Sequence, residues 1–250
     1  MQALILAAGY ATRLYPLTQN TPKPLLPIQG RPLVDYLLDK VEPIKELSSV
    51  VVVTNDKFYS HFEKWAGGRQ NLKAKIRIVN DQTQSNEDRL GSVGDVDFVL
   101  RKGLITNDLL VLGGDNLFDE KLGGFLQWAQ QKSPAAVAGM FDIKDKKEAT
   151  KFGVVGVDPR GKIISFEEKP QNPQSTLIGM CLYFFPKPTL PRVSQYLQES
   201  RTSDTTGDYI QWLSQREDVY GFTFHGKWYD IGSLEAYREA EERFLGRSPK

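Results

Sequence analysis

Three cationic residues near the start of the chain have the surroundings of a phosphate-binding site. Arg13, Lys23 and Arg31 are the only charged side chains before Asp35, so no acid opposes them in this segment. Arg13 lies in a loop of small residues, and prolines on both sides of Lys23 stiffen the chain there. A guanidinium fork and a lysine held in a fixed direction suit phosphate groups. A plain surface turn remains the alternative for each residue at this point.

Two acidic residues could hold a metal ion. Asp115 follows a pair of glycines at the end of an apolar stretch, and Asp230 interrupts the apolar run 228–232. Mg²⁺ prefers one or two carboxylates together with substrate phosphates, and a carboxylate in apolar surroundings needs a partner. Paired, Asp115 and Asp230 would supply the two acidic ligands of a magnesium nucleotide, and the glycines would let a ligand approach the backbone closely. A tight turn capped by Asp115 is the alternative.

A third charged group lies at the end of a predicted strand. Glu168 and Lys169 are adjacent, so in a regular strand their side chains point to opposite sides. Both can reach one ligand only if the strand ends at that point, before Pro170. A charged strand end exposed to solvent is the alternative.

The composition excludes several classes of protein. Lys plus Arg is 32 and Asp plus Glu is 31 in 250 residues, a formal charge of +1, so no overall basic field exists to bind nucleic acid or a membrane. One cysteine, Cys181, and two histidines are too few for a zinc cluster. The apolar stretch 3–8 has no basic segment before it and is too short for a signal peptide or a membrane span. We expect a cytoplasmic protein.

Alternating strands and helices must position these residues. Short apolar runs predict strands buried in a parallel sheet, and a proline-rich loop follows the first of them. Strands are predicted at 2–8, 50–53, 75–79 and 108–112, and helices at 33–41, at 57–65 and from Val93 to Gly103. This order requires right-handed crossovers and a layered, mainly parallel sheet.

After about residue 140 the pattern changes to antiparallel strands. Segments 153–157 and 162–168 flank a turn tetrad, which predicts a hairpin. Further elements are predicted at 177–185 and 219–224, both strands, and from Leu234, an amphipathic helix with Ser233 as its N-cap. No repeat or long linker divides the chain.

Six motifs follow one another in an order that resembles the sugar-1-phosphate nucleotidyltransferases, or NDP-sugar pyrophosphorylases, typified by glucose-1-phosphate thymidylyl- and uridylyltransferases. They read LAAGYATRLYPLT, PKPLLPI, LGSVGD, GGDN, FGVVGVD with GKIISFEEKP, and WYDIGSLEAY, and the resemblance runs from residue 3 to about residue 245. The resemblance implies an α/β fold, a Rossmann-like three-layer sandwich with a mixed, mainly parallel central sheet, as in nucleotide-diphospho-sugar transferases. It leaves no room in these residues for the β-helix or acyltransferase domain of some relatives.

The resemblance also implies a division of the chain and a reaction. A single domain, 1–250, would contain a nucleotide-binding half (1–140), a sugar-binding half (141–232), and a C-terminal helix and tail (233–250). The implied reaction converts an NTP, with dTTP or UTP favoured, and a sugar 1-phosphate into an NDP-sugar and pyrophosphate. Mg²⁺ is the implied cofactor, and a homo-oligomer is compatible with the family. Such catalysis consists mostly of positioning and charge neutralisation.

Roles for individual residues follow from the matching motifs. Arg13, Lys23 and Lys169 resemble the catalytic cations, and Asp115 and Asp230 resemble the Mg²⁺ ligands. The nucleotide site would comprise Leu6, Ala7, Ala8, Gly9, Arg13, Lys23, Gly91 and Asp115, and the sugar site Gly153, Glu168, Lys169 and Gly179.

The chain departs from the family pattern at a few positions. Ala11 stands where many members have glycine, so we expect a negative φ there. Segment 82–89 does not align with a base-reading segment, and Ile178 replaces the polar residue that often precedes Gly179. The nucleobase and the sugar therefore stay open.

Two other functions are compatible with the motifs. One is a non-catalytic, regulatory paralogue that binds a nucleotide-sugar, since a fold alone does not confer activity. Such paralogues usually lose the lysine or a metal carboxylate, and both are kept here. The other is a GT-A-type glycosyltransferase, although Asp115-Asn116-Leu117 lacks the second acid of an Asp-x-Asp metal site.

Overall fold

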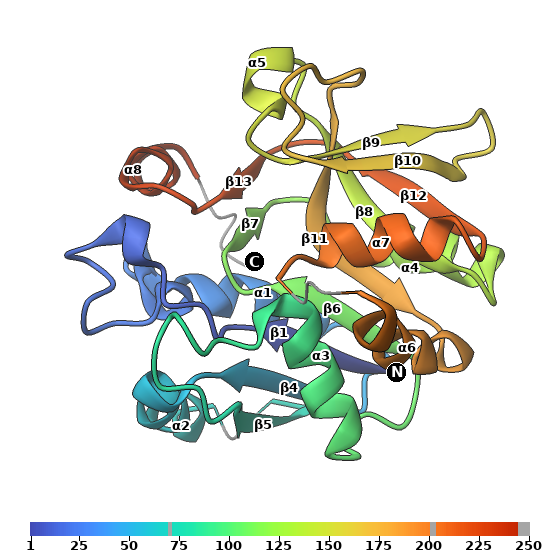
Figure 1. Ribbon diagram of the computed structural model, residues 1–250. Helices are drawn as coiled ribbons and strands as arrows, with labels where there is room; N and C mark the ends of the chain where they lie inside the picture. Colours follow the sequence, from blue (N-terminus) through green and yellow to red (C-terminus); the bar gives the residue numbers. More distant parts are fainter. Residues whose placement is uncertain (70–71, 201–203, 245–250) are drawn as a thin grey trace.

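A nine-stranded sheet forms the centre of the computed structural model, which describes residues 1–69, 72–200 and 204–244 (Figure 1). Residues 245–250 of the expected tail lie outside the described residues. The middle of the sheet is parallel, in the order β5 (Lys75–Asn80), β4 (Ser49–Thr54), β1 (Gln2–Leu6) and β6 (Leu109–Gly113).

The second half of the chain extends this sheet mainly with antiparallel pairs of strands. β11 (Leu177–Phe185) pairs antiparallel with β6 and with β8 (Ala136–Asp142), whereas β12 (Val219–Phe224) pairs parallel with β8. β9 (Gly153–Val157) and β10 (Ile163–Glu168) form the expected hairpin. The mixed sheet with helices on both faces confirms the expected α/β fold.

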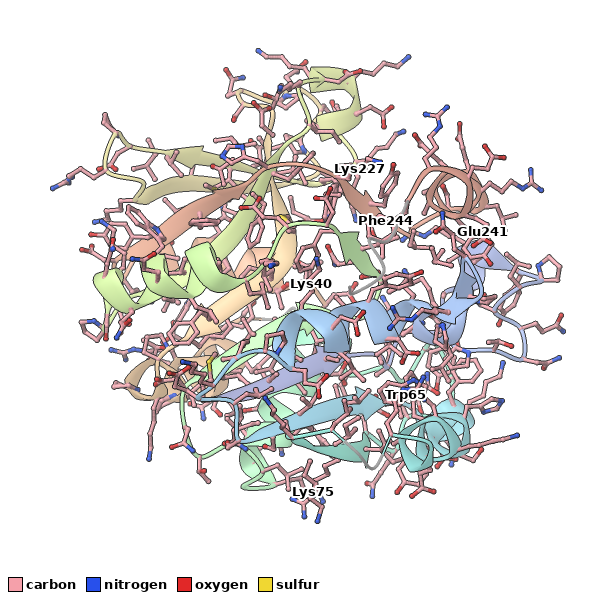
Figure 2. All side chains as sticks on the ribbon, turned by 180° about the vertical axis from the view of Figure 1, so that it is seen from behind. Lys40, Trp65, Lys75, Lys227, Glu241 and Phe244 are labelled. Carbon is pink, nitrogen blue, oxygen red and sulfur yellow. The ribbon has the colours of Figure 1, made fainter. Side chains whose placement is uncertain are left out.

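Helices cover both faces because neighbouring strand residues point to opposite sides. On one face Leu4 packs in a core with Val96 of α3, and on the other Ile5 packs with Leu37 of α1. The covering helices are α3 (Gly91–Arg101), α6 (Pro191–Glu199) and α7 (Thr206–Ser214) on the first face, and α1 (Leu33–Val41), α2 (Tyr59–Gly67) and α4 (Gly123–Lys132) on the second. Figure 2 shows the second face, with Lys40 of α1 and Trp65 of α2 labelled. No helix in the described ranges is long and apolar enough to cross a membrane.

Most predicted elements are present, with ends shifted by a few residues. The first strand stops at Leu6, although the Ala7 amide still donates to the Val53 carbonyl at 2.9 Å. The strand β8 was missed because small residues and Gly139 weaken its apolar pattern. A Cβ at Gly139 would lie 3.0 Å from Leu182, so this glycine is needed for packing within the sheet.

A small second sheet brings the end of the chain back to the end of β6. β13 (Trp228–Asp230) pairs antiparallel with β7 (Asn116–Phe118), with Asp230 opposite Asn116. The Trp228 indole donates to the Asn116 side-chain oxygen at 2.7 Å. The helix α8 (Leu234–Arg243) then packs beside the N-terminal loop, and its N-cap Ser233 accepts from the Ala236 amide as expected (Figure 1).

The glycine pair before Asp115 has a different role from the expected one. A Cβ on Gly114 would lie 2.5 Å from the Leu6 carbonyl oxygen and 2.9 Å from the Pro24 ring. A Cβ on Gly113 would lie 2.6 Å from the Asn116 amide. The prediction that these glycines open the backbone to a ligand is therefore wrong, because protein atoms occupy the space beside them.

Replacing Gly114 by alanine should destabilise the fold. Because the new methyl group meets backbone as well as the Pro24 ring, we expect the free energy of unfolding to fall by about 1–3 kcal/mol. The control is Gly123→Ala at the start of α4, where no atom lies within 4 Å of the new Cβ. That control should be neutral or stabilising by up to about 1 kcal/mol. Urea unfolding measures both, and equal stabilities would contradict this packing account.

Candidate active site

A cavity of about 380 Å³ lies where β1 and β6 end. In an open α/β sheet, ligands bind beyond the carboxyl ends of the parallel strands. The cavity wall includes many of the residues that the sequence singled out, from the first loop, the proline-rich segment and the end of β6: Leu6, Ala7, Gly9, Arg13, Lys23 and Asp115.

An ion pair joins the proline-rich segment to the end of β6. Lys23 begins a short 3₁₀ turn, Lys23–Leu25, and its Nζ donates to Asp115 Oδ2 at 2.6 Å. The Asn116 amide donates to the other oxygen, Asp115 Oδ1, at 3.3 Å. Burial works to raise the pKa of Asp115, but the Lys23 ammonium outweighs it, so the pKa of this carboxyl lies below its ordinary value. Asp115 is therefore a carboxylate at neutral pH.

Asp230 lies next to this pair. The Ile231 amide donates to the Asp115 carbonyl at 3.1 Å, which ties the end of β13 to the end of β6. Burial and the negative charge of Asp115 raise the pKa of Asp230 to about 6, although Lys23, Arg13 and Lys169 oppose the rise. The two carboxylates are thus close enough to repel each other, and a cation between them would relieve the repulsion.

The donor set fits Mg²⁺. In the described part of the chain no three His, Cys, Asp or Glu side chains are grouped to hold a metal. Mg²⁺ is commonly bound through one or two carboxylates, with waters and substrate phosphates completing its octahedron. A carboxylate pair beside the cationic side chains of Lys23 and Arg13 is suited to that role and less suited to a closed protein site such as structural zinc.

The three cationic residues near the start of the chain, Arg13, Lys23 and Arg31, do not all face the cavity. Arg13 lies exposed in a 3₁₀ turn on the cavity wall and has no ion pair among the described residues. Arg31 instead forms a two-pronged pair with Asp39 of α1, at 2.9 and 3.2 Å. Arg13 and Lys23 are therefore the two early cations that face the cavity.

Ala11 has a left-handed backbone, so the prediction of a negative φ is wrong. Its φ is 49° and its ψ is 41°. For a residue with a Cβ this conformation costs roughly 1–2 kcal/mol. The surroundings hold it, because the Ala11 carbonyl accepts hydrogen bonds from the Thr18 hydroxyl at 2.7 Å and from the Leu14 amide at 3.0 Å.

Glu168 and Lys169 meet on one side of the chain. β10 ends at Glu168, and Lys169 has a left-handed φ of 47°, so the alternation of a regular strand no longer applies. Lys169 Nζ lies 3.4 Å from Glu168 Oε1. The positive charge of Lys169 also works to lower the pKa of Asp230, against the larger effect of burial, so Lys169 is within electrostatic range of that carboxyl.

Three glycines lie against the Phe166 ring, two residues before Glu168. A Cβ at Gly153, Gly179 or Gly207 would lie 2.4, 3.0 or 2.6 Å from the Phe166 ring, respectively. At Gly153 and Gly207 it would also come within 3.0 Å of Glu168. Gly207, in the first turn of α7, was missed, and a single glycine after two threonines carries no sequence signal that could have revealed it.

The remaining predicted residues lie behind or beside the cavity. The Ala8 carbonyl accepts from the buried Asn55 amide at 2.8 Å, and Gly91 begins α3 with a φ of 77°. The sequence did not assign Tyr10, Asn86 and Arg89, which also line the cavity. The last two belong to the segment 82–89 that matched no known pattern.

The family is shown by comparison with known proteins. A family model described as nucleotidyl transferase matches residues 2–246, and the chain belongs to this family. This confirms the resemblance that the six motifs indicated. The protein named bifunctional protein GlmU of Methanocaldococcus jannaschii is 31% identical over 248 residues, and that of Methanococcus aeolicus is 29% identical over 233 residues. The alignments cover 99% and 93% of this chain but 55% and 51% of those proteins, so the chain spans about half their length.

Solved structures share the fold. A structure from Bacillus anthracis, described as a glucose-1-phosphate thymidylyltransferase in complex with a sucrose, has a TM-score of 0.84 at 21% identity, covering 100% of this chain and 96% of that one. A UDP-glucose pyrophosphorylase complexed with UDP-glucose has a TM-score of 0.79 at 22% identity, with 97% of both chains covered.

Removing the Lys23 ammonium should destabilise the protein at neutral pH. Lys23→Met leaves the Asp115 carboxylate without its cation, and we expect the free energy of unfolding in metal-free buffer to fall by roughly 1–3 kcal/mol. The control Arg31→Met breaks an exposed pair and should cost less than about 1 kcal/mol. Urea unfolding over a pH series measures both.

The pH dependence gives a second check on the same pair. Because the native pKa of Asp115 is below its ordinary value, the stability from its carboxylate is present above an unfolded pKa of about 3.9 and is lost as the pH falls through the native value. The deficit of Lys23→Met should therefore shrink in acid. A deficit that is constant with pH would contradict the ion-pair account.

Proposed function

We propose that this chain is a Mg²⁺-dependent sugar-1-phosphate nucleotidyltransferase, which transfers a nucleoside monophosphate from an NTP to a sugar 1-phosphate. The observation that carries the proposal is that Arg13, Lys23 and Asp115 line one cavity, with Asp230 next to the Lys23–Asp115 pair. Family membership over residues 2–246 supports it. A phosphate-binding cation and a pair of metal-binding carboxylates are the groups such a transfer requires.

The proposed reaction needs no covalent enzyme intermediate. A phosphate oxygen of the sugar 1-phosphate attacks the α-phosphorus of the NTP in line, the bond from that phosphorus to the oxygen bridging the α- and β-phosphates breaks, and pyrophosphate leaves. Arg13 holds the β- and γ-phosphates, and Lys23 can exchange its carboxylate partner for an oxygen of the α-phosphate. Lys169 binds the phosphate of the sugar, and Glu168 binds sugar hydroxyl groups.

Asp115 and Asp230 would hold the magnesium ion. When bound, Mg²⁺ would neutralise phosphate charge and stabilise the charge that develops on the leaving pyrophosphate. Leu6, Ala7, Ala8, Gly9 and Gly91 would form the nucleotide site, and Gly153 and Gly179 would shape the sugar site. We propose the same division of the chain as above, with nucleotide binding in 1–140 and sugar binding in 141–232.

A pyrimidine nucleotide, dTTP or UTP, is our first proposal for the donor, with a hexose 1-phosphate as acceptor. Segment 82–89 and Ile178 depart from the family pattern, so both choices need a direct test. We further propose that the protein is cytoplasmic and that it can form a homo-oligomer.

A substrate matrix tests the function. The chain is incubated with each NTP and dTTP, with hexose, N-acetylhexosamine and other sugar 1-phosphates, in the presence and absence of Mg²⁺, and pyrophosphate release is measured. We expect release only where a nucleotide, a sugar 1-phosphate and Mg²⁺ are all present. If no combination releases pyrophosphate but an NDP-sugar raises the melting temperature of the chain, the chain is a non-catalytic protein that binds a nucleotide-sugar.

The metal carboxylates should be essential for turnover. Asp115→Asn and Asp230→Asn each remove a charged ligand, and we expect kcat to fall about 100-fold or more. The control Asp39→Asn changes an exposed aspartate whose partner is Arg31 and should keep activity near normal. Steady-state kinetics at saturating Mg²⁺ measure all three. Near-normal activity in both site variants would refute the metal assignment.

A further inference from the structure

Two buried carboxyl groups lie together outside the proposed metal site. Asp81 follows β5 and Asp95 lies on α3, and their exposed fractions are 4% and 5%. Neither forms a salt bridge in the described part of the chain. Asp81 Oδ1 accepts hydrogen bonds from the Thr83 amide at 2.7 Å and the Thr83 hydroxyl at 2.8 Å. Asp81 Oδ2 and Asp95 Oδ1 are buried and have no donor among the described residues.

A proton between the two carboxyl groups would satisfy both orphaned oxygens. Each side chain acts on the other in this buried space, and two carboxyl groups can hydrogen-bond to each other only when one of them carries a proton. Two neighbouring buried carboxyl groups cannot both ionise. Burial and the neighbouring Asp81 charge hold the pKa of Asp95 well above its ordinary value. Asp88 adds another negative charge near Asp81, in keeping with the pair retaining its proton.

The segment that carries Asp81 lies against one wall of the cavity. The Asp81 amide donates to the Thr54 carbonyl at 2.8 Å, and the Asp56 amide donates to the Thr83 carbonyl at 3.0 Å, so segment 81–83 is fixed to the end of β4. Thr83 lies beside the buried hydroxyl of Tyr10. Tyr10 lines the cavity, as do Asn86 and Arg89 farther along the same loop. We call Tyr10, Asn86 and Arg89 the nucleoside wall.

We propose that Asp81 and Asp95 share one proton and act as a positioning pair for the nucleoside wall. The Asp95 carboxyl O–H donates to Asp81 Oδ2, and Asp81 keeps its other oxygen for Thr83. This proposal rests on the proposed function, because it assigns the wall to the nucleotide. When the proton leaves for solvent in alkali, two buried charges face each other, segment 81–83 loosens, and the KM for the NTP rises.

Variants of Asp95 separate a shared proton from simple packing. The amide of Asp95→Asn donates to Asp81 at every pH, whereas Asp95→Ala leaves Asp81 Oδ2 without a donor. The matched control is Asp97→Asn, two residues along α3 and 6% exposed, whose side chain instead accepts from Arg101 at 2.7 Å and from Ser194. It should keep the wild-type pH profile.

The kinetic readout is the KM of each substrate between about pH 6 and about pH 9.5. We expect the KM of the wild type for the NTP to rise at least about fivefold over this range. The KM of Asp95→Asn should stay within about twofold, and the KM of Asp95→Ala should be about tenfold above the wild-type value at about pH 6 over the whole range. The KM of the sugar 1-phosphate should stay within about twofold in all of them. A wild-type NTP KM that does not change with pH, an Asp95→Asn curve that follows the wild type, or equal effects on both substrates would overturn the proposal.

A stability measurement decides the shared proton without any activity. A carboxyl with a raised native pKa contributes full stability below its unfolded pKa of about 3.9 and loses it as the pH rises through the native value. The urea midpoint of the wild type should therefore fall relative to that of Asp95→Asn as the pH rises, and the midpoint of Asp97→Asn, which keeps the pair, should follow the wild type. A constant difference would overturn the shared proton. If no NTP supports turnover, the proposed function fails, and these unfolding curves still decide the pair.

Discussion

The ion pair between Lys23 and Asp115 is the contact on which the site depends. It joins a proline-stiffened segment near the N-terminus to the end of β6, across 92 residues of chain, at 2.6 Å. Gly114 lets the end of β6 come against the Leu6 carbonyl and the Pro24 ring, next to this pair. The pair supplies a cation to a carboxylate that is only partly exposed, and it fixes the Lys23 ammonium at the cavity wall.

The sheet topology brings the other charges to the same place. The parallel strands β1 and β6 end side by side, which is where an α/β sheet presents its loops to a ligand. The antiparallel β13 returns along β7 and adds Asp230, and the left-handed turn after β10 adds Lys169. Positive and negative groups thus gather at and beside one cavity, so the near-zero net charge of the chain conceals a locally charged site.

Much of this arrangement follows from sequence patterns, and the failures have physical causes. Apolar runs predicted the parallel strands because strands buried on both faces must be apolar throughout. Spacing along the chain could not tell that Arg31 pairs with Asp39, because that contact depends on how α1 packs. Nor could it show that Ala11 is left-handed, since hydrogen bonds to its carbonyl hold a conformation that its residue type disfavours. The Asp81–Asp95 contact joins two elements and has no local signal at all.

The central claim is direct transfer of a nucleotidyl group at the Lys23, Asp115 and Asp230 site. The most direct test uses an NTP labelled at its α-phosphate, mixed with the chain and Mg²⁺ before and after a sugar 1-phosphate is added. We predict that the label appears only in an NDP-sugar, only after the sugar 1-phosphate is added, and never on the protein. Label bound covalently to the chain, or no labelled NDP-sugar with any sugar 1-phosphate, would contradict it.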